Sequence, residues 1–434
     1  MSRRFLCFFV FSLLFLAASA FADAPGVYAI TGGTIHPVSG PEITNGAVII
    51  RDGLIESVGS AQAIPLDATI IDVKGGHIYP GIAVAKELMR REPSSVVRFV
   101  GTARGLETRL VPQAGFELSL IESAGLKNVG AAGKLKGLLV LPKSFLAARR
   151  LIKEFRPDVV VGAGGYVSGP VLLTAALAGV PTLVMESNAL PGFTNRQLAR
   201  FVDAAAVSFE ESLKFFHGKG VVIGNPVRRE FFEIPRKQRD PARFSLLVFG
   251  GSQGARAIND ALLAALPRLE RQRGVLRIVH QTGEADFERV RAGYDAAGWG
   301  ERADVRKYID DMVASFAESD LVVCRAGATT TAELIAAGKA SLMIPFPFAA
   351  DDHQRKNAEA LEKAGASVMV LQQDATGERL ARESGALVED PERVTRMEEA
   401  ARRLARGDAA AAAVDLIEGL VGRRQKAEDS QRQG

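Results

Sequence analysis

Short apolar segments alternate with helix-length amphipathic segments along most of this chain, from Gly75 to about residue 420. The strand-like segments of the first series are VVRFV at 96–100, DVVVG at 158–162, TLVME at 182–186, AAVSF at 205–209 and VVIG at 221–224. Pro226 marks a break, and the second series is SLLVFG at 245–250, LRIVHQ at 276–281, LVVCRAG at 321–327, ASLMIPF at 340–346 and ASVMVLQ at 366–372. Continuous apolar strands separated by helices are typical of parallel sheets covered on both faces. The pattern therefore predicts an α/β fold with two Rossmann-like, doubly wound domains and a ligand cleft at the carboxyl ends of the strands.

We expect the first of these domains at 68–226 and the second at 227–422, followed by a polar tail at 423–434. Glycine-rich turns stand between strand and helix at GGH (75–77), GAGGY (162–166) and GGSQGAR (250–256). Free N–H groups at such turns attract phosphate, although similar turns also serve packing alone. None of the turns has the full dinucleotide spacing, which favours a nucleotide sugar over NAD.

The composition is that of an ordinary globular protein and excludes collagen, coiled coil and disorder: 434 residues, 47% hydrophobic, with 54 Lys+Arg against 50 Asp+Glu. The net charge of +4 is a weak basic bias, which indicates local contact with an anionic surface and no nucleic-acid partner. Cys7 and Cys324 lie far apart and indicate no disulfide framework.

Residues 1–22 have the pattern of an export signal. Arg3 and Arg4 precede an uncharged apolar run from Phe5, and small residues suitable for cleavage follow at 18–22. The alternative is an uncleaved anchor, because the apolar run approaches the length of a spanning helix.

The segment at 23–67, with the strand that follows it, shows short alternating strands between Gly and Pro turns. It resembles the small β-segment that opens secreted metal-dependent amidohydrolases, in which a Pro-Gly is followed by a His-x-His metal pair. Here Pro80-Gly81 is followed by no histidine, and the whole chain has only five. The sequence therefore predicts no metal site of that kind.

From Gly75 to about Leu420 the chain resembles the MurG family of N-acetylglucosaminyltransferases. The matching segments, in order, are GGHIYPGIAVAKEL at 75–88, FVGTARGLE at 99–107, GAGGYVSGP at 162–170, ESNALPGFTNR at 186–196, GNPVR at 224–228, GGSQGAR at 250–256, CRAGATTTAELIAAGKA at 324–340 and DDHQRKNA at 351–358. The resemblance implies a GT-B fold and inverting transfer of N-acetylglucosamine from UDP-N-acetylglucosamine to lipid I, giving lipid II for peptidoglycan. Asp310-Asp311 and Asp351-Asp352 are adjacent and form no Asp-x-Asp metal pair, so we expect no obligatory metal and no cofactor.

The resemblance also assigns residues to UDP-N-acetylglucosamine. Ser252 would face the phosphates, Arg228 would lie near the diphosphate, and Glu333 would accept hydrogen bonds from the ribose. The remaining candidates are Lys74, Gly75, Gly76, Asn188, Ile309, Ala328, Thr329, Thr330, Thr331, Ala332 and Gln354. Each has a plainer interpretation as well: a tight turn for Ser252, a surface ion pair for Arg228, helix capping for Thr329–Glu333, core packing for Ile309 and a solvated loop for Gln354.

His77 is the only histidine in a Gly-rich turn, and it is the candidate catalytic residue, either as the base for the acceptor hydroxyl or as a ligand of the acceptor diphosphate. Its plainer interpretation is a packing residue of the turn.

The segment between Ala124 and Lys153 combines basic and apolar side chains and has no Asp or Glu. Its bases are Lys127, Lys134, Lys136, Lys143, Arg149, Arg150 and Lys153, and its apolar residues include Leu138, Leu139, Val140, Leu141, Phe145 and Leu146. This composition suits the anionic surface of the inner membrane, where the family works on the cytoplasmic face. The export signal at 1–22 conflicts with that location.

The chain departs from the family at its first glycine loop. The family has Gly-Gly-Thr-Gly-Gly-His, whereas this chain has only Lys74-Gly75-Gly76-His77 after the strand at 69–73. That strand is apolar enough to take the central place in the first Rossmann-like sheet. Two alternatives to the transferase stay open: a chain that binds the UDP-sugar without transfer, and a secreted amidohydrolase.

Overall fold

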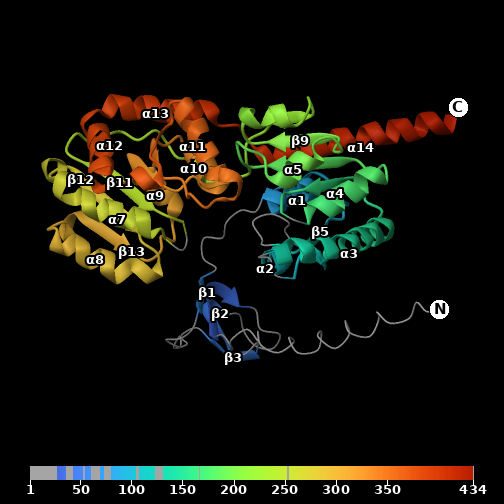
Figure 1. Ribbon diagram of the computed structural model, residues 1–434, viewed down its shortest axis with the longest axis horizontal. Helices are drawn as coiled ribbons and strands as arrows, with labels where there is room; N and C mark the ends of the chain where they lie inside the picture. The colour runs from blue at the N-terminus through green and yellow to red at the C-terminus, as the bar shows by residue number, and fades with distance from the viewer. Residues whose placement is uncertain are drawn as a thin grey trace, which may run out of the picture. The chain divides into compact units, whose positions relative to one another are not determined.

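The computed structural model describes residues 27–35, 43–51, 54–59, 69–72, 80–103, 107–122, 131–165, 167–251 and 254–433. The chain divides into two compact units, Met1–Gly76 and His77–Gly434 (Figure 1).

The first unit contains a four-stranded sheet in the order β3-β2-β1-β4. Its strands are β1 (Val27–Ile35), β2 (Ile43–Arg51), β3 (Leu54–Gly59) and β4 (Thr69–Asp72). β1 pairs antiparallel with β2 and parallel with β4, and Ile30 lies opposite Ile71. The expected place of the 69–73 strand in the first Rossmann-like sheet is therefore wrong, because β4 forms its ladder with β1.

The second unit begins with a lobe that we call the first lobe. Its helices and strands are α1 (Pro80–Arg91), β5 (Arg98–Gly101), α2 (Glu107–Gln113), β6 (Glu117–Leu120), α3 (Ala131–Phe155), β7 (Val160–Gly162), α4 (Ser168–Leu177), β8 (Thr182–Glu186), α5 (Phe193–Leu198), β9 (Ala204–Val207) and β10 (Gly220–Val222). They form a parallel sheet in the order β10-β9-β8-β7 and a separate parallel pair, β5-β6.

The two sheets of the first lobe meet at the start of α1. A Cβ added at Gly81 would lie 3.3 Å from the Ala163 side chain, just beyond β7, and 3.6 Å from the ring of Phe99 on β5. β8 and β9 are buried along their whole length, whereas β5 and β7 keep partly exposed residues. Exposure of β5 and β7 follows from their position, since each is paired on one side only among the described strands.

A short helix, α6 (Arg229–Phe232), leads into the second lobe. The second lobe contains β11 (Phe244–Phe249), α7 (Arg256–Ala265), β12 (Leu276–Gln281), α8 (Phe287–Ala296), β13 (Ala303–Arg306), α9 (Met312–Glu318), β14 (Leu321–Cys324), α10 (Ala328–Ala337), β15 (Ser341–Met343), α11 (His353–Lys363), β16 (Ser367–Met369), α12 (Gly377–Glu389) and α13 (Pro391–Leu404). Its six strands are parallel, in the order β13-β12-β11-β14-β15-β16. This is the strand order of a dinucleotide-type Rossmann sheet, with the crevice between β11 and β14.

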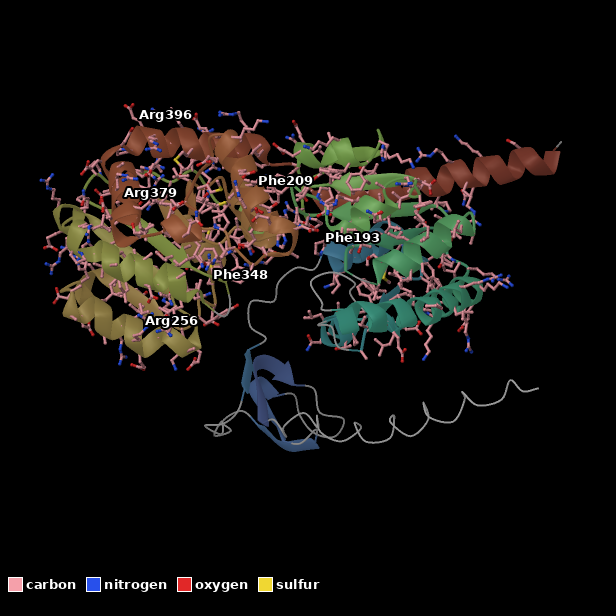
Figure 2. The ribbon with its side chains drawn as sticks, in the orientation of Figure 1. Phe193, Phe209, Arg256, Phe348, Arg379 and Arg396 are labelled. Atoms are coloured by element: carbon pink, nitrogen blue, oxygen red, sulfur yellow. The ribbon has the colours of Figure 1, made fainter. Side chains whose placement is uncertain are left out.

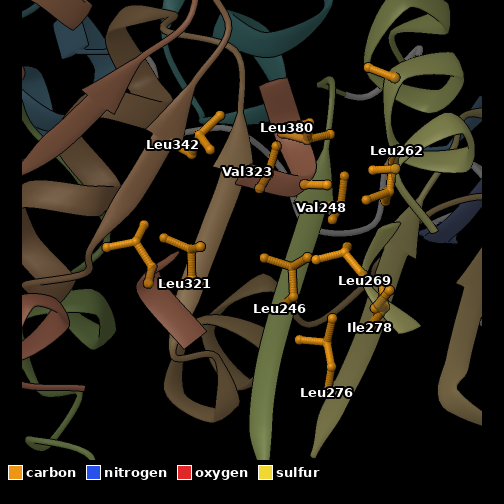
Figure 3. Packing of buried hydrophobic residues seen from close by; sticks show 14 of the residues in the cluster. Leu246, Val248, Leu262, Leu269, Leu276, Ile278, Leu321, Val323, Leu342 and Leu380 are labelled. Atoms are coloured by element: carbon orange, nitrogen blue, oxygen red, sulfur yellow. The ribbon is translucent and has the colours of Figure 1, made fainter. Parts of the chain in front are cut away.

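Alternation along β11 shows why the central strands are apolar throughout. Leu246 and Val248 pack on one face with Leu262 of α7 (Figure 3). Leu247 and Phe249 pack on the other face with Phe316 of α9. Successive side chains of a strand point to opposite faces, so a sheet covered on both faces buries every residue. The predicted α/β class with two Rossmann-like lobes is confirmed.

The last helix, α14 (Ala409–Gln433), returns to the first lobe. Ala413, Val414 and Ile417 are buried in one cluster with Val84 of α1 and Leu183 of β8. The predicted second domain ran to residue 422, whereas this apolar face belongs to the core of the first lobe. The segment at 423–433, expected as a polar tail, continues the helix.

Candidate functional site

The start of α10 lies directly after β14, at the carboxyl end of the second-lobe sheet. Gly327 precedes the helix, and no side chain caps it. The hydroxyl of Thr331 is buried and donates within the helix, at 3.0 Å from the Gly327 carbonyl and 2.9 Å from that of Ala328. The capping interpretation of this segment is therefore not what the structure shows, and the first N–H groups of α10 form a positive helix end. The predicted residues Ala328, Thr329, Thr330 and Ala332 are partly exposed in its first turns.

Glu333 and Arg228 come together beside this helix start. Burial raises the pKa of the Glu333 carboxyl to about 7, and the Arg228 guanidinium opposes that rise. Arg228 stands just before α6, and its guanidinium carbon lies 5.0 Å from the ring centre of Phe231. Among the described residues no carboxylate forms an ion pair with Arg228, so its interpretation as a surface ion pair does not hold. The two side chains are therefore close enough to interact electrostatically, while their role in binding a nucleotide stays a prediction.

Ile309 is buried in the core with Phe249 and Phe316. Its backbone N–H donates to Gln281 Oε1 at 2.7 Å, and Gln281 Nε2 donates to the Gly251 carbonyl at 2.9 Å. Gln281 thus ties the Ile309 segment to the third glycine-rich turn. Sequence reasoning missed Gln281, although a polar residue that ends an otherwise apolar strand was the available signal.

The third glycine-rich turn needs glycine at its end. Gly251 has φ +97° and Gly254 has φ +73°, both in the left-handed region. A Cβ at Gly254 would also overlap the backbone carbonyl of Thr282. The turn therefore packs its backbone directly on the loop after β12.

We expect Gly254→Ala to lower the free energy of unfolding by about 2–4 kcal/mol, because the new Cβ meets backbone and the left-handed φ is strained. The measurement is urea unfolding followed by tryptophan fluorescence. Gly274→Ala is the matched control, since no atom lies within 4 Å of its added Cβ and its φ is ordinary. Equal losses in the two variants would contradict the packing argument.

Asn188 lies just after β8 and is partly exposed. Its side chain contacts Glu186, the last residue of β8, and Asn357 on α11. Sequence reasoning had not singled out these two residues, although both lie in the matching segments. Gln354, at the start of α11, accepts a hydrogen bond from the Phe346 backbone N–H at 3.0 Å through Oε1. Gln354 is thus held against the loop after β15, so it is not a free solvated side chain.

Five predicted residues, Lys74, Gly75, Gly76, His77 and Ser252, lie outside the described residues. Within the described ranges, His, Cys, Asp and Glu side chains form no group of three or more placed to hold a metal ion.

Comparison with known proteins gives consistent matches to both lobes. Residues 74–207 match the glycosyltransferase family 28 N-terminal domain, and residues 245–416 match the glycosyltransferase family 28 C-terminal domain. The resemblance of the segment at 23–81 to amidohydrolases stays a prediction.

Two curated relatives have the name UDP-N-acetylglucosamine–N-acetylmuramyl-(pentapeptide) pyrophosphoryl-undecaprenol N-acetylglucosamine transferase. The one from Anaeromyxobacter sp. (strain K) is 52% identical over 352 residues, covering 81% of this chain and 91% of the relative. The one from Myxococcus xanthus (strain DK1622) is 48% identical over 349 residues, covering 80% of this chain and 91% of the relative.

Solved structures agree with this relationship. MurG of Acinetobacter baumannii superposes with a TM-score of 0.68 at 35% identity, covering 80% of this chain and 96% of that one. UDP-GlcNAc 2-epimerase from Neisseria meningitidis, solved with UDP-GlcNAc, has a TM-score of 0.55 at 14% identity, covering 79% of this chain and 96% of that one, and shares the fold alone. The chain belongs to the MurG family of glycosyltransferases.

Proposed function

We propose that this chain transfers N-acetylglucosamine from UDP-N-acetylglucosamine to lipid I and so forms lipid II in peptidoglycan synthesis. The observation that carries the proposal is the meeting of Arg228 and Glu333 at the start of α10, in a chain whose relatives are named for this transfer. Such a site offers hydrogen-bond acceptance to a ribose and positive charge to a diphosphate.

In the proposed reaction the 4-hydroxyl oxygen of N-acetylmuramic acid forms a bond to the anomeric carbon of N-acetylglucosamine. The bond between that carbon and the diphosphate oxygen breaks, UDP leaves, and the configuration inverts. The hydroxyl proton passes to a base, for which His77 is our candidate. Negative charge grows on the departing UDP, so the N–H groups of α10 and the Arg228 guanidinium would stabilise the transition state more than the ground state.

We place the donor's ribose against Glu333, its uracil beside the Ile309 backbone and its sugar near Asn188 and Gln354. The Ile309 N–H is already used by Gln281, so its carbonyl is the group left for the uracil edge. The phosphates would lie on the turn that carries Ser252. The substrates are UDP-N-acetylglucosamine and lipid I, with no cofactor.

A second candidate is a chain that binds the UDP-sugar without transfer. The first glycine loop is short, and the strand before it pairs with β1 in the first unit. Both features affect the loop expected to bind the acceptor and leave the second lobe unchanged. They therefore favour a chain that binds the donor but lacks a complete acceptor loop.

Transfer of labelled N-acetylglucosamine to a lipid I analogue by the full chain distinguishes the two. We expect turnover, and we expect Ser252→Ala combined with Glu333→Ala to abolish it. UDP binding without turnover in the unmodified chain would support the second candidate, and absence of both would contradict both.

We also propose that the protein acts as a peripheral protein on the cytoplasmic face of the inner membrane. None of the helices in the described part of the chain is both long and apolar enough to cross a bilayer. On α3 the exposed residues Lys143, Leu146, Arg150 and Lys153 recur at helical spacing on one face, and Leu146 is 68% exposed. An apolar side chain ringed by bases suits an anionic lipid surface.

Lys143→Glu combined with Arg150→Glu is expected to weaken binding to vesicles that contain anionic lipid by roughly 30-fold or more, because each base near the surface contributes about 1 kcal/mol. Co-sedimentation at low and high salt measures the effect, which salt should reduce. Arg382→Glu with Arg396→Glu makes the same charge change on the second lobe, where both side chains are exposed. Arg396 is labelled in Figure 2. Equal weakening by this control pair would refute the α3 surface.

A further inference from the structure

The Arg228 guanidinium lies over an aromatic ring. Its central carbon is 5.0 Å from the centre of the Phe231 ring, which is within the distance at which a cation is attracted to a ring face. Among the described residues, no Asp or Glu forms an ion pair with Arg228. The next residue, Arg229, by contrast, pairs with Glu233 at 2.9 Å. Within the described part of the chain, the partner of Arg228 is therefore a neutral ring.

The local backbone brings the two side chains together. Arg228 is the N-cap residue of α6, and Phe231 follows three residues later in this single-turn helix. The Phe231 backbone N–H donates to the Arg228 carbonyl at 3.1 Å and closes the turn. Side chains three positions apart lie on one side of a helical turn, so the closed turn presents the ring to the guanidinium.

The core of the second lobe fixes the Phe231 ring. This side chain is fully buried and packs edge-to-face on Phe316 of α9, with 5.2 Å between the ring centres and 77° between the planes. Phe316 is also fully buried, and its ring centre lies 6.1 Å from that of Phe249. Phe249 is the last residue of β11, directly before the third glycine-rich turn. Three packed rings thus connect the end of β11 with Arg228.

A ring and a carboxylate leave an arginine in different states. A carboxylate binds the N–H groups of a guanidinium and cancels its charge, whereas a ring face attracts the cation and leaves the N–H groups in its plane available. The charge of Arg228 also acts beyond the ring, because it opposes the rise in the pKa of the Glu333 carboxyl. An arginine with such a partner keeps both its charge and its donors for an anionic ligand.

We propose that Phe231 is a positioning residue for the transfer: its ring face orients the Arg228 guanidinium toward the diphosphate of the donor without neutralising it. Phe231 is fully buried, so it acts through Arg228 and not by contact with a substrate. The inference rests on the proposed function, because it assumes that Arg228 meets the diphosphate.

The test uses full-length Phe231→Leu, because leucine is apolar but has no ring. We expect the single-turnover rate of transfer to fall roughly tenfold, the effect of losing a partly desolvated cation–π interaction. Phe231→Met fills the space with a more adaptable side chain that also lacks the ring, so the same loss is expected. If the leucine variant does not fold, the methionine variant carries the test.

Phe216→Leu is the matched control. Phe216 is equally buried, in the core of the first lobe with Leu172 and Val207. Its replacement removes a ring of the same size from a core and should leave the rate of the folded protein within about twofold. An equal loss of rate in the control and in the Phe231 variants overturns the inference.

A double-mutant cycle with Arg228→Ala gives the readout that a purely structural role would not move. If Phe231 acts through Arg228, its replacement should cost less than about threefold in the Arg228→Ala background. An unchanged rate in both Phe231 variants, or an equally large loss in that background, overturns the inference.

Failure of the proposed function is recognised separately. If the unmodified chain binds UDP-N-acetylglucosamine without transfer, the same cycle is run on the Kd of UDP and on that of uridine, which lacks the diphosphate. Replacement of Phe231 should then weaken UDP roughly tenfold and leave uridine within about twofold. Equal weakening of the two ligands overturns the inference. A chain that binds neither UDP-N-acetylglucosamine nor UDP overturns the function and this inference together.

Discussion

Glu333→Gln is expected to make the ligand-free protein more stable at pH 8 while it weakens the binding of UDP-N-acetylglucosamine. Burial raises the pKa of Glu333 from 4.5 to about 7, so the folded protein holds a proton there that the unfolded chain has already lost. Ionising this buried carboxyl costs stability, in total on the order of 2 kcal/mol once solvent access is allowed for. Glutamine keeps the shape and removes that cost.

The stability gained by Glu333→Gln should depend on pH. A folded pKa above the unfolded one means that stability falls as pH rises from 4.5 to about 7 and then levels off. The advantage of Glu333→Gln should therefore be absent near pH 4.5 and complete above pH 7. Thermal unfolding at both ends of this range measures it.

Binding should change in the opposite direction. A carboxylate accepts two ribose hydroxyls through strong bonds, whereas a neutral amide offers one weaker acceptor, so we expect affinity at pH 8 to fall roughly 30-fold. Calorimetry with UDP-N-acetylglucosamine is the measurement, because its diphosphate diester does not titrate in this range. In the unmodified protein, affinity should rise between pH 6 and pH 8.

Glu359→Gln is the matched control. Glu359 is on α11, bonded to Lys356 and Arg355, which hold its pKa below the usual range, so its replacement should not stabilise the protein at pH 8. Equal stabilisation by both substitutions, or unchanged binding by Glu333→Gln, would contradict the assignment of Glu333.

Arg228→Ala is expected to lower the rate of transfer by about 10²–10³-fold, the usual loss when one donor to a developing anion is removed from a preorganised site. The Arg228 charge also opposes the rise in the Glu333 pKa, so its removal should raise that pKa further and shift the pH dependence of donor binding upward. Single-turnover kinetics and calorimetry across pH measure the two effects.

Two further variants test the specificity of this effect. Arg228→Lys separates the charge of Arg228 from the shape of its side chain, and Arg229→Ala is the neighbouring control. Lysine keeps the charge but loses the planar group above Phe231, so an intermediate rate is expected. Arg229 is adjacent, 89% exposed and paired with Glu233 at 2.9 Å, and its replacement should leave the rate within about threefold. A full rate in Arg228→Ala would remove Arg228 from the site.

Much of the second lobe was predictable because its signals are local. Apolar segments predicted β11, β12 and β14 with ends within three residues of those observed, and the glycine-containing turns after β11 and β14 identified the helices that follow. The family motifs identified Arg228, Ile309, Glu333 and the start of α10 as candidates. They could not predict that the Thr331 hydroxyl donates to the Gly327 carbonyl, or that the Ile309 N–H donates to the Gln281 side chain.

The sequence by itself determined the class of fold, the helices and strands of the second lobe and the residue types of the proposed donor site, because these depend on neighbours a few residues away. Only the tertiary structure decided that β4 pairs with β1, that α14 returns to the first lobe, and that Asn357 meets Asn188, a residue 169 positions earlier. Local sequence is compatible with more than one partner for a strand or an amide. The choice is made by long-range packing and by the need of each buried donor and acceptor for a partner.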